Sequence, residues 1–271
     1  HTDQLILKDK GLDYRVLNLA TNTFNENETS YYHKSIGGYH AAKLRRYQEM
    51  IEAYINPQMS RIMKAVADSD GDMTRVNGDS LFPVLNMLNT KYIIVPLQGG
   101  QTVPLLNPYA YGNAWFVDRL TFADNANQEI ERIGQIDLRH EAVADKRFAD
   151  VLGEAVAQDK NSVAKLLAYE PNQLTYEVSS DKGGVLVFSE VYYPGWTATI
   201  DGQPAELGRV NYILRALRVP AGKHQVKLAF FPKSVDTTET IAYVAYVVLL
   251  LIIVGGLYDT WRRKKNNQTT H

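Results

Sequence analysis

The stretch LTYEV, from Leu174 to Val178, decides the fold of the second half of the chain, because apolar and polar residues alternate along it. The same alternation returns in Val226, Leu228 and Phe230. Residues two apart on a strand point to the same face of a sheet, so these apolar side chains should cover a core. We therefore predict a small antiparallel β-sandwich over residues 161–236.

Other strands of this sandwich are indicated by short apolar runs that recur at roughly 8 to 12 residues. These runs cover residues 163–169, 185–191, 197–200, 213–219 and 225–231. Turn-forming residues separate them, namely Pro171-Asn172, Lys182-Gly183-Gly184, Asp201-Gly202 and Ala221-Gly222. Such pairs favour tight connections between neighbouring antiparallel strands.

Beyond the last strand, the run IAYVAYVVLLLIIVGGLY from Ile241 to Tyr258 carries no charge. At a rise of about 1.5 Å per residue, a helix of this run would be about 27 Å long, close to the hydrocarbon thickness of a bilayer. A buried core helix is the alternative, but such helices seldom remain uncharged over this length. We predict a transmembrane helix over residues 237–261.

A basic tail over residues 262–271 follows the apolar run and begins with Arg262, Arg263, Lys264 and Lys265. Cationic residues are retained on the cytoplasmic side during membrane insertion. We expect this tail to be cytoplasmic and the residues before about 237 to be extracytoplasmic.

The first part of the chain mixes two periodicities. Tyr14 to Leu19 alternates like a strand, whereas residues 41–55 repeat apolar side chains at helical spacing. A second helix should begin at Pro57 and run to about Ala67. Shorter elements are expected at 85–89, 92–95, 115–117 and 125–133, with a Gly- and Pro-rich loop after residue 95. Residues 1–160 therefore read as a mixed α/β domain, and the whole chain as α+β.

Composition excludes several classes of protein. The chain has 271 residues and a net charge of -1, which does not fit a nucleic-acid-binding protein. It has no cysteine, so disulfides, thiolate metal sites and a cysteine nucleophile are excluded together. It begins with His1 and shows no signal peptide before its first domain. We expect it to be the C-terminal piece of a longer membrane protein.

The densest group of ligand-capable residues surrounds the pair Gly37-Gly38, which we expect to open a helix. Backbone N–H groups at a helix N-terminus, together with nearby cations, favour binding of a phosphate or pyrophosphate. A solvated helix face with tyrosines packed beneath it is the alternative. The two histidines have no third ligand at a useful spacing, so no metal site is expected. The candidate substrate-binding residues here are His33, Lys34, Tyr39, His40, Lys43, Arg45 and Arg46.

A second candidate segment, YYPGWTATIDG, runs from Tyr192 to Gly202. Tyr193 and Trp196 would offer aromatic faces on which a sugar ring could stack. The alternative is structural, because Pro-Gly and Asp-Gly are turn dipeptides and a tryptophan can close the end of a sandwich.

No self-sufficient active site is visible. The acidic residues Asp79, Asp118, Asp124 and Glu190 are too dispersed to suggest a pair of catalytic carboxylates. Nucleophile-elbow, zinc-helix and dinucleotide motifs are absent from the sequence. We therefore expect no catalytic residue, cofactor or metal in this chain.

The motifs of the second half occur in a distinctive order: Tyr192-Tyr193-Pro194-Gly195-Trp196, then Asp201-Gly202, then Pro220-Ala221-Gly222-Lys223-His224, then a strand and the apolar run. This order resembles the C-terminal extracytoplasmic region of YfhO-family bacterial membrane proteins. Residues 14–17, 30–40 and 88–92 also resemble the Bacteroidetes members. The resemblance spans nearly the whole chain.

The resemblance implies a part of a multi-spanning GT-C-type glycosyltransferase in the bacterial cytoplasmic membrane. Such proteins take a sugar from a polyprenyl-phosphate carrier and add it to a cell-envelope acceptor, and their catalytic acids lie in a multi-helix core that this sequence does not contain. The implied partners are that core, the lipid bilayer, the lipid-linked sugar and a glycan acceptor, with no nucleic acid. This piece would assist substrate binding or brace the core and should not be active alone.

Two non-enzymatic readings compete with this one. In the first, the chain forms a membrane-anchored surface module whose sandwich binds glycans. In the second, it forms an ectodomain that only supports assembly. Many hydrophobic helices upstream would favour the transferase, whereas a single signal peptide would favour the binding module.

Overall fold

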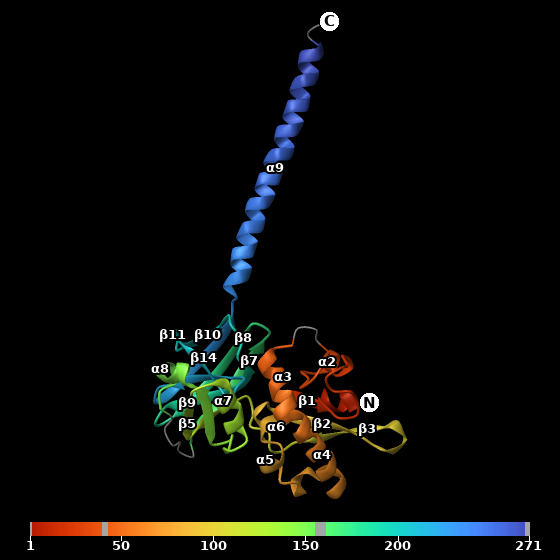
Figure 1. Cartoon of the computed structure of the whole chain (residues 1–271), viewed down its shortest axis with the longest axis vertical. Coiled ribbons are helices and arrows are strands. Elements are labelled where there is room, and N and C mark those ends of the chain that lie inside the picture. The colour runs from red at the N-terminus through yellow and green to blue at the C-terminus, as the bar shows by residue number, and fades with distance from the viewer. Residues whose placement is uncertain (1, 40–42, 155–160, 269–271) are drawn as a thin grey trace. The chain divides into compact units, whose positions relative to one another are not determined.

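The computed structural model describes residues 2–39, 43–154 and 161–268, and Figure 1 shows the arrangement of their elements. The helices are α1 (Thr2–Ile6), α2 (Glu28–Tyr32), α3 (Arg45–Met50), α4 (Asn56–Asp68), α5 (Gly78–Leu81), α6 (Pro83–Met87), α7 (Ala126–Ile133), α8 (Ala149–Leu152) and α9 (Lys233–Gln268). The strands up to residue 160 are β1 (Arg15–Asn18), β2 (Thr90–Pro96), β3 (Thr102–Leu106), β4 (Ala114–Val117), β5 (Arg119–Ala123) and β6 (Glu141–Asp145). Those after it are β7 (Val163–Glu170), β8 (Gln173–Ser180), β9 (Gly184–Val191), β10 (Trp196–Ile200), β11 (Gln203–Ala205), β12 (Leu207–Val210), β13 (Leu214–Val219) and β14 (Gly222–Phe230). The predicted α+β class is confirmed.

Two sheets share a core and make the sandwich. One has the order β11-β10-β14-β8-β7 and the other has the order β4-β9-β13-β12-β6-β5. Leu174, Tyr176 and Val178 of β8 are buried in the core that the two sheets share, and the ring of Tyr176 lies 5.0 Å from that of Phe188 on β9. The alternation of LTYEV therefore marks the buried face of a strand, as predicted.

Two of the predicted turns connect paired strands, whereas Lys182-Gly183-Gly184 and Ala221-Gly222 connect strands of different sheets. Glu170 pairs with Gln173 across Pro171-Asn172, and Ile200 pairs with Gln203 across Asp201-Gly202. Asp201 and Gly202 have φ angles of 50° and 81°, the left-handed values that a two-residue type I′ hairpin requires.

The six-stranded sheet takes strands from both sides of residue 160. β9, β12 and β13 come from the second part of the chain, whereas β4, β5 and β6 come from the first. Ala114 of β4 is buried in the same core as Tyr176. The described residues up to Ala229 form one compact unit. The boundary at residue 160 thus falls between strands of one sheet, and separate folding of the two parts stays a prediction.

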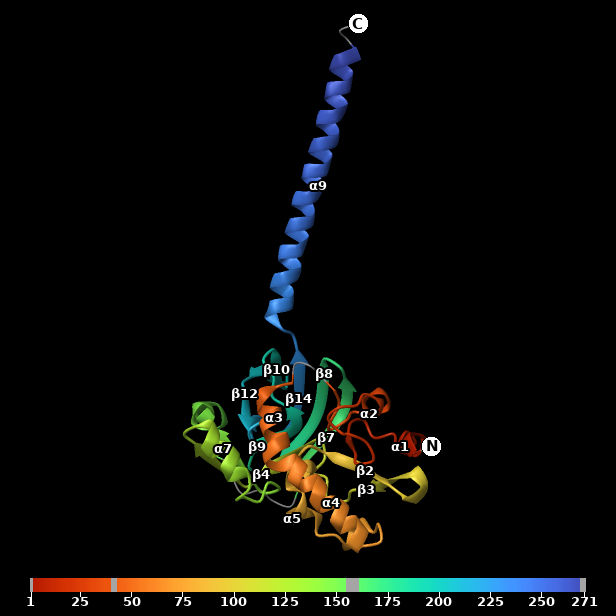
Figure 2. The same cartoon turned by 45° about the vertical axis from the view of Figure 1, so that its right-hand side comes forward.

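A second hydrophobic core joins the three-stranded sheet β1-β2-β3 to the helices. In this core, Leu17 of β1 and Ile93 of β2 are buried together with Ile55 and Ile62 from the long helical run. Figures 1 and 2 show this run, α3 to α4, beside β1 and β2 in both views.

The break predicted between two helices at Pro57 is wrong. The chain stays helical from Arg45 to Asp68 because a π-helical turn, Ile51–Ile55, joins α3 to α4. The N–H of Asn56 bonds to the carbonyl of Ile51 in this wider turn. Proline has no N–H and clashes with the carbonyl four residues before it, and a local π-turn is one known way to relieve that conflict.

Several strands escaped the sequence analysis. The stretch expected to be a Gly- and Pro-rich loop contains β3, with Pro104 inside it. β3 lies at the edge of its sheet, where a residue without an N–H is tolerated. β5, β6, β11 and β12 were also missed.

Helix α9 belongs to a second compact unit, which begins at Phe230. Its segment Thr238–Tyr258 has a mean hydropathy of 2.5, and none of it is buried against other parts of the protein. An apolar helix with apolar side chains exposed on every side is suited to a lipid environment. By length and composition, this segment can cross a membrane.

Candidate functional site

A pocket of about 290 Å³ lies where the first candidate segment meets the sandwich. We call it the Lys34 pocket. Lys34, Lys43 and Arg15 supply its cations. Most of its wall is apolar and comes from Phe24, Ile36, Leu44, Tyr47, Ile51 and Val191. Such a combination of apolar walls and few charged groups is typical of a ligand site.

Backbone hydrogen bonds fix the segment that carries Lys34. The N–H of Val16 in β1 donates to the carbonyl of Lys34, and the N–H of Ile36 donates to the carbonyl of Val16. The hydroxyl of Tyr47 donates to the carbonyl of Ile36 at 2.7 Å. Residues 34–36 therefore run alongside β1 and hold Lys34 at the pocket.

The Gly37-Gly38 pair serves close packing. A Cβ atom on Gly37 would overlap the backbone carbonyl of Thr23, and the N–H of Gly38 donates to that carbonyl at 2.7 Å. The prediction that the pair opens a helix is wrong. Lys43 and Leu44 are not helical, and α3 begins only at Arg45. Leu44 keeps an extended backbone and its side chain lines the pocket.

Lys34 joins two acidic residues that lie far apart in the sequence. Its Nζ donates to Asp13 Oδ1 at 3.0 Å and to Glu190 Oε1 at 2.7 Å. The same nitrogen lies 4.9 Å from the ring centre of Tyr169 on β7. The side chain of Lys34 is 29% exposed, so its cation can be reached from solvent.

Arg15 binds Glu190 and two backbone carbonyls. Its Nη1 donates to the carbonyls of Leu88 and Ser189 at 2.7 and 2.6 Å, and its Nη2 lies 3.6 Å from Glu190 Oε2. Arg15 is buried, so these partners replace the water that its guanidinium loses.

The pKa values of the two carboxylates shift in opposite directions. Burial raises the pKa of Asp13, and the negative charge of Glu190 raises it further. Burial alone would raise the pKa of Glu190 too, but the charges of Arg15 and Lys34 lower it to about 2. Glu190 is therefore the permanent anion of the pair, and Asp13 takes up a proton first as the pH falls.

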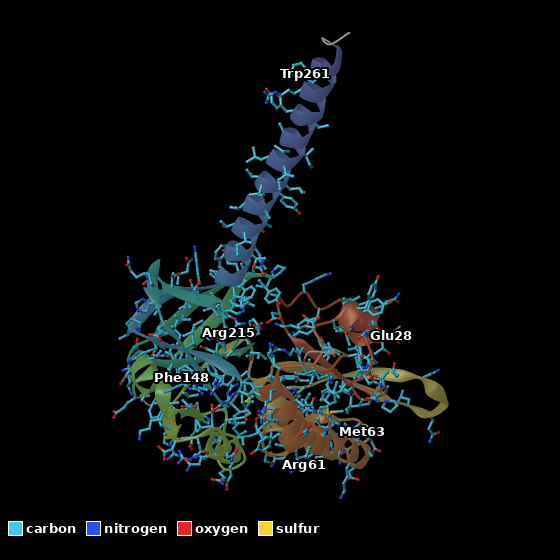
Figure 3. The ribbon with its side chains drawn as sticks, turned by 45° about the horizontal axis from the view of Figure 1, so that its top comes forward. Glu28, Arg61, Met63, Phe148, Arg215 and Trp261 are labelled. Carbon is cyan, nitrogen blue, oxygen red and sulfur yellow. The ribbon has the colours of Figure 1, made fainter. Side chains whose placement is uncertain are left out.

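The second candidate segment meets the same group through Arg215. The guanidinium of Arg215 lies 3.8 Å from the ring centre of Trp196, and its Nε donates to the carbonyl of Val191 at 3.0 Å. Figure 3 shows Arg215 among the strands of the sandwich. Its Nη1 and the hydroxyl of Tyr176 are buried and have no hydrogen-bond partner among the described residues. Burial lowers the pKa of Arg215 to about 10.

These residues lie at the end of the sandwich where β14 finishes. Tyr169, beside Lys34, pairs with Leu174 of β8, and Leu174 pairs with Leu228 of β14. The hydroxyl of Thr197, next to Trp196, donates to the carbonyl of Ala229 at 3.2 Å. In the sequence, only residues 231–237 separate this end of β14 from the apolar segment.

The other residues predicted in the first segment differ in their surroundings. Lys43 lines the pocket and donates to the carbonyl of Phe24 at 3.1 Å. His33 is buried, with Nε2 2.8 Å from Asp3 Oδ1. The side chain of Arg45 is 92% exposed and pairs with Glu49. Tyr39 and, in the second segment, Tyr193 are exposed. His40 lies outside the described residues.

Arg46 belongs to a different network around Glu129, which is fully buried. One carboxylate oxygen of Glu129 accepts hydrogen bonds from Arg46 and Arg209, each at 3.1 Å, and the other accepts one from the N–H of Tyr212 at 3.2 Å. The guanidinium of Arg46 also lies 4.2 Å from the ring centre of Tyr212. These contacts connect α3 to α7 and to the sandwich.

The structure thus brings together Lys34, Lys43 and, through Arg215, Trp196. Sequence reasoning missed Asp13 and Arg15 and set Glu190 aside as isolated, because Glu190 lies far along the chain from the other two. The motif resemblance did include Arg15 and its neighbour Tyr14 within residues 14–17, which is the one signal that could have drawn attention to this segment.

Comparison with known proteins gives two matches. Residues 135–242 match the model of the family described as "Bacterial membrane protein YfhO". The "Uncharacterized protein YfhO" of Bacillus subtilis (strain 168) is 24% identical over 132 residues, which cover 49% of this chain and 14% of that relative. The chain therefore corresponds to a small part of the relative's length. No solved structure matches the chain.

Proposed function

The chain belongs to the YfhO family of bacterial membrane proteins, and from this premise we propose that it is the C-terminal extracytoplasmic part of a larger glycosyltransferase-like protein. That protein would move a sugar from a polyprenyl-phosphate carrier to an acceptor in the cell envelope. In this proposal the Lys34 pocket receives the phosphate headgroup of the lipid-linked sugar.

The charge balance of the pocket supports this role. Three cations, Arg15, Lys34 and Lys43, line it, and two carboxylates, Asp13 and Glu190, face Lys34. One positive charge is therefore left over, and Arg215 adds another nearby. When Asp13 is protonated, Lys34 loses one of its two anionic partners, and an incoming phosphate oxygen can replace it.

The apolar walls favour a ligand that carries an apolar chain as well as a phosphate group. Phe24, Leu44 and Ile51 would contact the first part of a prenyl chain, while the cations hold the headgroup. A purely inorganic anion would gain nothing from these walls. The observation that carries the proposal is therefore Lys34, placed between two carboxylates at the edge of an apolar pocket.

The catalytic step would belong to a multi-helix core outside this chain. A carboxylate of that core would deprotonate the acceptor hydroxyl while the lipid phosphate leaves. Lys34 and Arg15 would stabilise the charge that develops on the leaving phosphate. This chain alone would bind the headgroup without transferring the sugar.

We place the residues before about 237 outside the cytoplasmic membrane and the basic tail inside. The order of an apolar segment followed by Arg262 and Arg263 supports this orientation.

Complementation with the full-length protein tests the proposal. Strains that express wild type, Lys34→Ala or Lys34→Arg are compared for glycan transfer and for the amount of protein in the membrane. We expect Lys34→Ala to lose at least about tenfold in transfer at normal abundance, since a hydrogen bond to a charged group contributes about 1.5–3 kcal/mol. Lys34→Arg should retain part of the activity because it keeps the charge.

Arg45→Ala is the matched control, because Arg45 is a neighbouring cation outside the pocket with a 92% exposed side chain. It should behave as wild type. Unchanged transfer in Lys34→Ala would contradict the proposal.

A second candidate function, bracing of the membrane core, is favoured by the ion pairs of the predicted site residues. His33 pairs with Asp3 and Arg46 pairs with Glu129, so these side chains are engaged within the protein. A parallel loss of abundance and transfer in Lys34→Ala would favour bracing over headgroup binding.

A further inference from the structure

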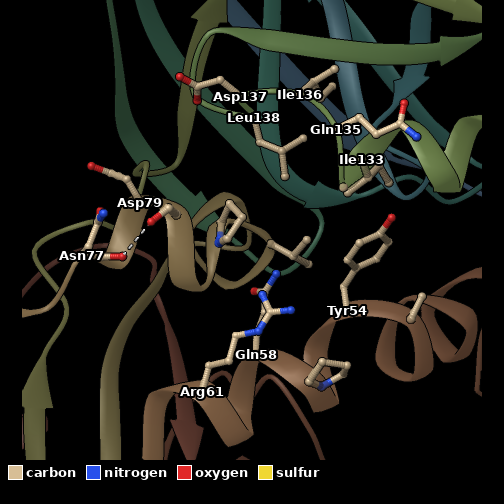
Figure 4. Close-up of a pocket in the computed structure, with 16 residues that line it drawn as sticks. Tyr54, Gln58, Arg61, Asn77, Asp79, Ile133, Gln135, Ile136, Asp137 and Leu138 are labelled. Atoms are coloured by element: carbon tan, nitrogen blue, oxygen red, sulfur yellow. Dashed lines mark hydrogen bonds between the residues drawn. The ribbon is translucent and has the colours of Figure 1, made fainter. Parts of the chain in front are cut away.

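A larger pocket, of about 580 Å³, lies further along the helical run. We call it the Asp79 pocket. It is formed by α4 with the preceding π-turn, by the segment around α5 and by residues 133–138 that follow α7. Figure 4 shows these three segments surrounding one space. Its volume falls within the roughly 300–1,000 Å³ that ligand pockets usually have.

The polar groups that enter this pocket differ from those of the Lys34 pocket. Figure 4 shows Gln58 and Arg61 on α4, Asn77 and Asp79 at α5, and Gln135 and Asp137 on the third segment, and all six line the pocket. These side chains are planar amides, carboxylates and one guanidinium. Together they offer both donors and acceptors of hydrogen bonds, which is what a ligand with many hydroxyl groups requires.

Gln58 shows that one of these groups is built into the fold. It is only 2% exposed, and its Oε1 accepts a hydrogen bond from the N–H of Leu85 at 3.2 Å. This bond fixes the amide and leaves its NH₂ group directed at the pocket. Gln58 also lines the pocket, so a ligand there can accept a hydrogen bond from an amide that is already held in place.

Tyr54 supplies an aromatic wall. Its hydroxyl donates to the carbonyl of Ile130 at 2.6 Å, which anchors the ring beside the pocket. A Cβ atom on Gly134 would lie 3.1 Å from that hydroxyl and 3.3 Å from the ring, so the glycine allows the close approach. The C–H groups of a sugar ring can pack on such a face.

The charge of the pocket selects among ligands. Two carboxylates, Asp79 and Asp137, and one cation, Arg61, line it, so one negative charge is left over. Both carboxylates also act on the buried phenol of Tyr111, whose pKa is raised first by burial and then by these two charges. A phosphate or another anion would be repelled, and an apolar ligand would leave the polar groups unpaired.

We propose that the Asp79 pocket binds neutral sugar residues of a glycan. This inference deepens the proposed function, on which it rests, because it assigns the acceptor to a site separate from the lipid headgroup. Asp79 and Asp137 would accept hydrogen bonds from sugar hydroxyls, Gln58 and Arg61 would donate to them, and Tyr54 would pack against the ring.

Ligand-observed NMR on the full chain in detergent micelles tests the proposal. The neutral probes are maltose, lactose and N,N′-diacetylchitobiose, and the anionic probe is glucuronic acid. We expect saturation transfer to at least one neutral disaccharide and none to glucuronic acid. The variants Asp79→Asn and Arg61→Ala should weaken binding of that disaccharide by at least about tenfold, because each removes a charged partner.

Lys64→Ala is the matched control, because Lys64 is an exposed cation on the same helix that does not line the pocket. It should bind the disaccharide as wild type does. Absence of binding for all neutral probes, or equal binding by wild type and Asp79→Asn, would overturn the proposal, as would binding of glucuronic acid alone.

The same assay separates this inference from the proposed function. Lys34→Ala should bind the disaccharide normally even if it abolishes transfer in cells. Sugar binding that survives in Asp79→Asn while Lys34→Ala loses transfer would reject the acceptor pocket and leave the headgroup site standing.

Discussion

His224 and Asp201 join the β10–β11 hairpin to the start of β14, and both segments carry motifs that resemble the YfhO family. Nδ1 of His224 lies 2.6 Å from one carboxylate oxygen of Asp201, and the other oxygen accepts a hydrogen bond from the N–H of Gln225 at 2.8 Å. Asp201 belongs to the Asp-Gly turn between β10 and β11, and His224 lies near the start of β14. The two motifs therefore form one structural unit, although 23 positions separate these residues in the sequence.

This pair predicts a pH dependence of stability. The hydrogen bond to Asp201 raises the pKa of His224 above 6.5, and the same bond lowers the pKa of Asp201 below 3.8. A raised histidine pKa contributes stability that is fully present below pH 6.5 and is lost as the pH rises through the folded-state value. The melting temperature of Asp201→Asn should therefore fall below that of wild type at pH 6 and approach it at high pH. A difference that stays constant from pH 6 to 9 would contradict this prediction.

Glu190→Gln should destabilise the protein by about 3–5 kcal/mol at pH 7, because it leaves buried Arg15 and partly buried Lys34 without their shared anion. Urea denaturation measures the change. The control Glu170→Gln alters an exposed glutamate at the end of β7 and should have little effect.

The acid side of the stability curve gives a further check on Glu190. Its pKa is lowered from 4.5 to about 2, so its contribution is present above pH 4.5 and is lost as the pH falls toward 2. Asp13 acts with the opposite sign, because its raised pKa lets the folded protein take up a proton more readily. Wild type should lose stability below pH 4.5 more steeply than Glu190→Gln. Parallel curves for the two proteins would show that Glu190 is not held as an anion by Arg15 and Lys34.

Gly37→Ala should lower stability by roughly 1–3 kcal/mol, because its Cβ atom would overlap the carbonyl of Thr23 and force the backbone apart. We expect reduced protein in the membrane, which immunoblotting measures. Gly255→Ala is the control, since a Cβ atom there meets no other atom. Normal abundance of Gly37→Ala would mean that the pair Gly37-Gly38 has a role other than packing.

Glu129→Gln should destabilise the protein by roughly 3 kcal/mol, because a neutral amide leaves buried Arg209 with only the more distant carboxylate of Asp145, at 3.8 Å. Arg46→Ala should lower thermal stability less, since its side chain is 28% exposed and water can replace part of its contacts. Thermal unfolding of wild type, Glu129→Gln and Arg46→Ala measures the order of their stabilities. If Glu129→Gln were as stable as wild type, this network would contribute little to the free energy of unfolding.

A fragment of residues 161–236 should not fold alone. It lacks β4 and β6, which pair with β9 and β12, so both would become unpaired edges, and the shared core would lose Ala114. Circular dichroism and hydrogen exchange would compare it with a fragment of residues 2–236. Cooperative unfolding of the short fragment would support the domain boundary predicted at residue 160.

Local features of the fold could be read from the sequence. The alternation in Leu174 to Val178, the Asp201-Gly202 turn and the cap Asn125, whose side chain accepts from the N–H of Gln128, are each decided by a few consecutive residues. Pro57 misled the analysis because a neighbouring π-turn can absorb its missing hydrogen bond. The strands β5 and β6 were missed because their pairing lies with distant parts of the chain rather than with adjacent hairpins.

The candidate site was only half predictable. Lys34 and Lys43 stood out through the density of polar residues around them, and both line one pocket. His33, Arg45 and Arg46 looked equivalent to them in the sequence, yet each makes an ion pair of its own away from that pocket. Composition cannot separate a cation that faces a pocket from one that holds two elements together.

By itself, the sequence determined the apolar helix, the strands with alternating faces and the positions of the tight turns, because these depend on the polarity and backbone preferences of neighbouring residues. The tertiary structure alone decided that Lys34 meets Glu190, which lies 156 positions away, and that Trp196 stacks on Arg215. It also decided that strands from both parts of the chain share a sheet. The physical reason is that such contacts form only when burial of the cores brings distant segments together. The pattern of neighbouring residues does not show which charged side chains will then form ion pairs.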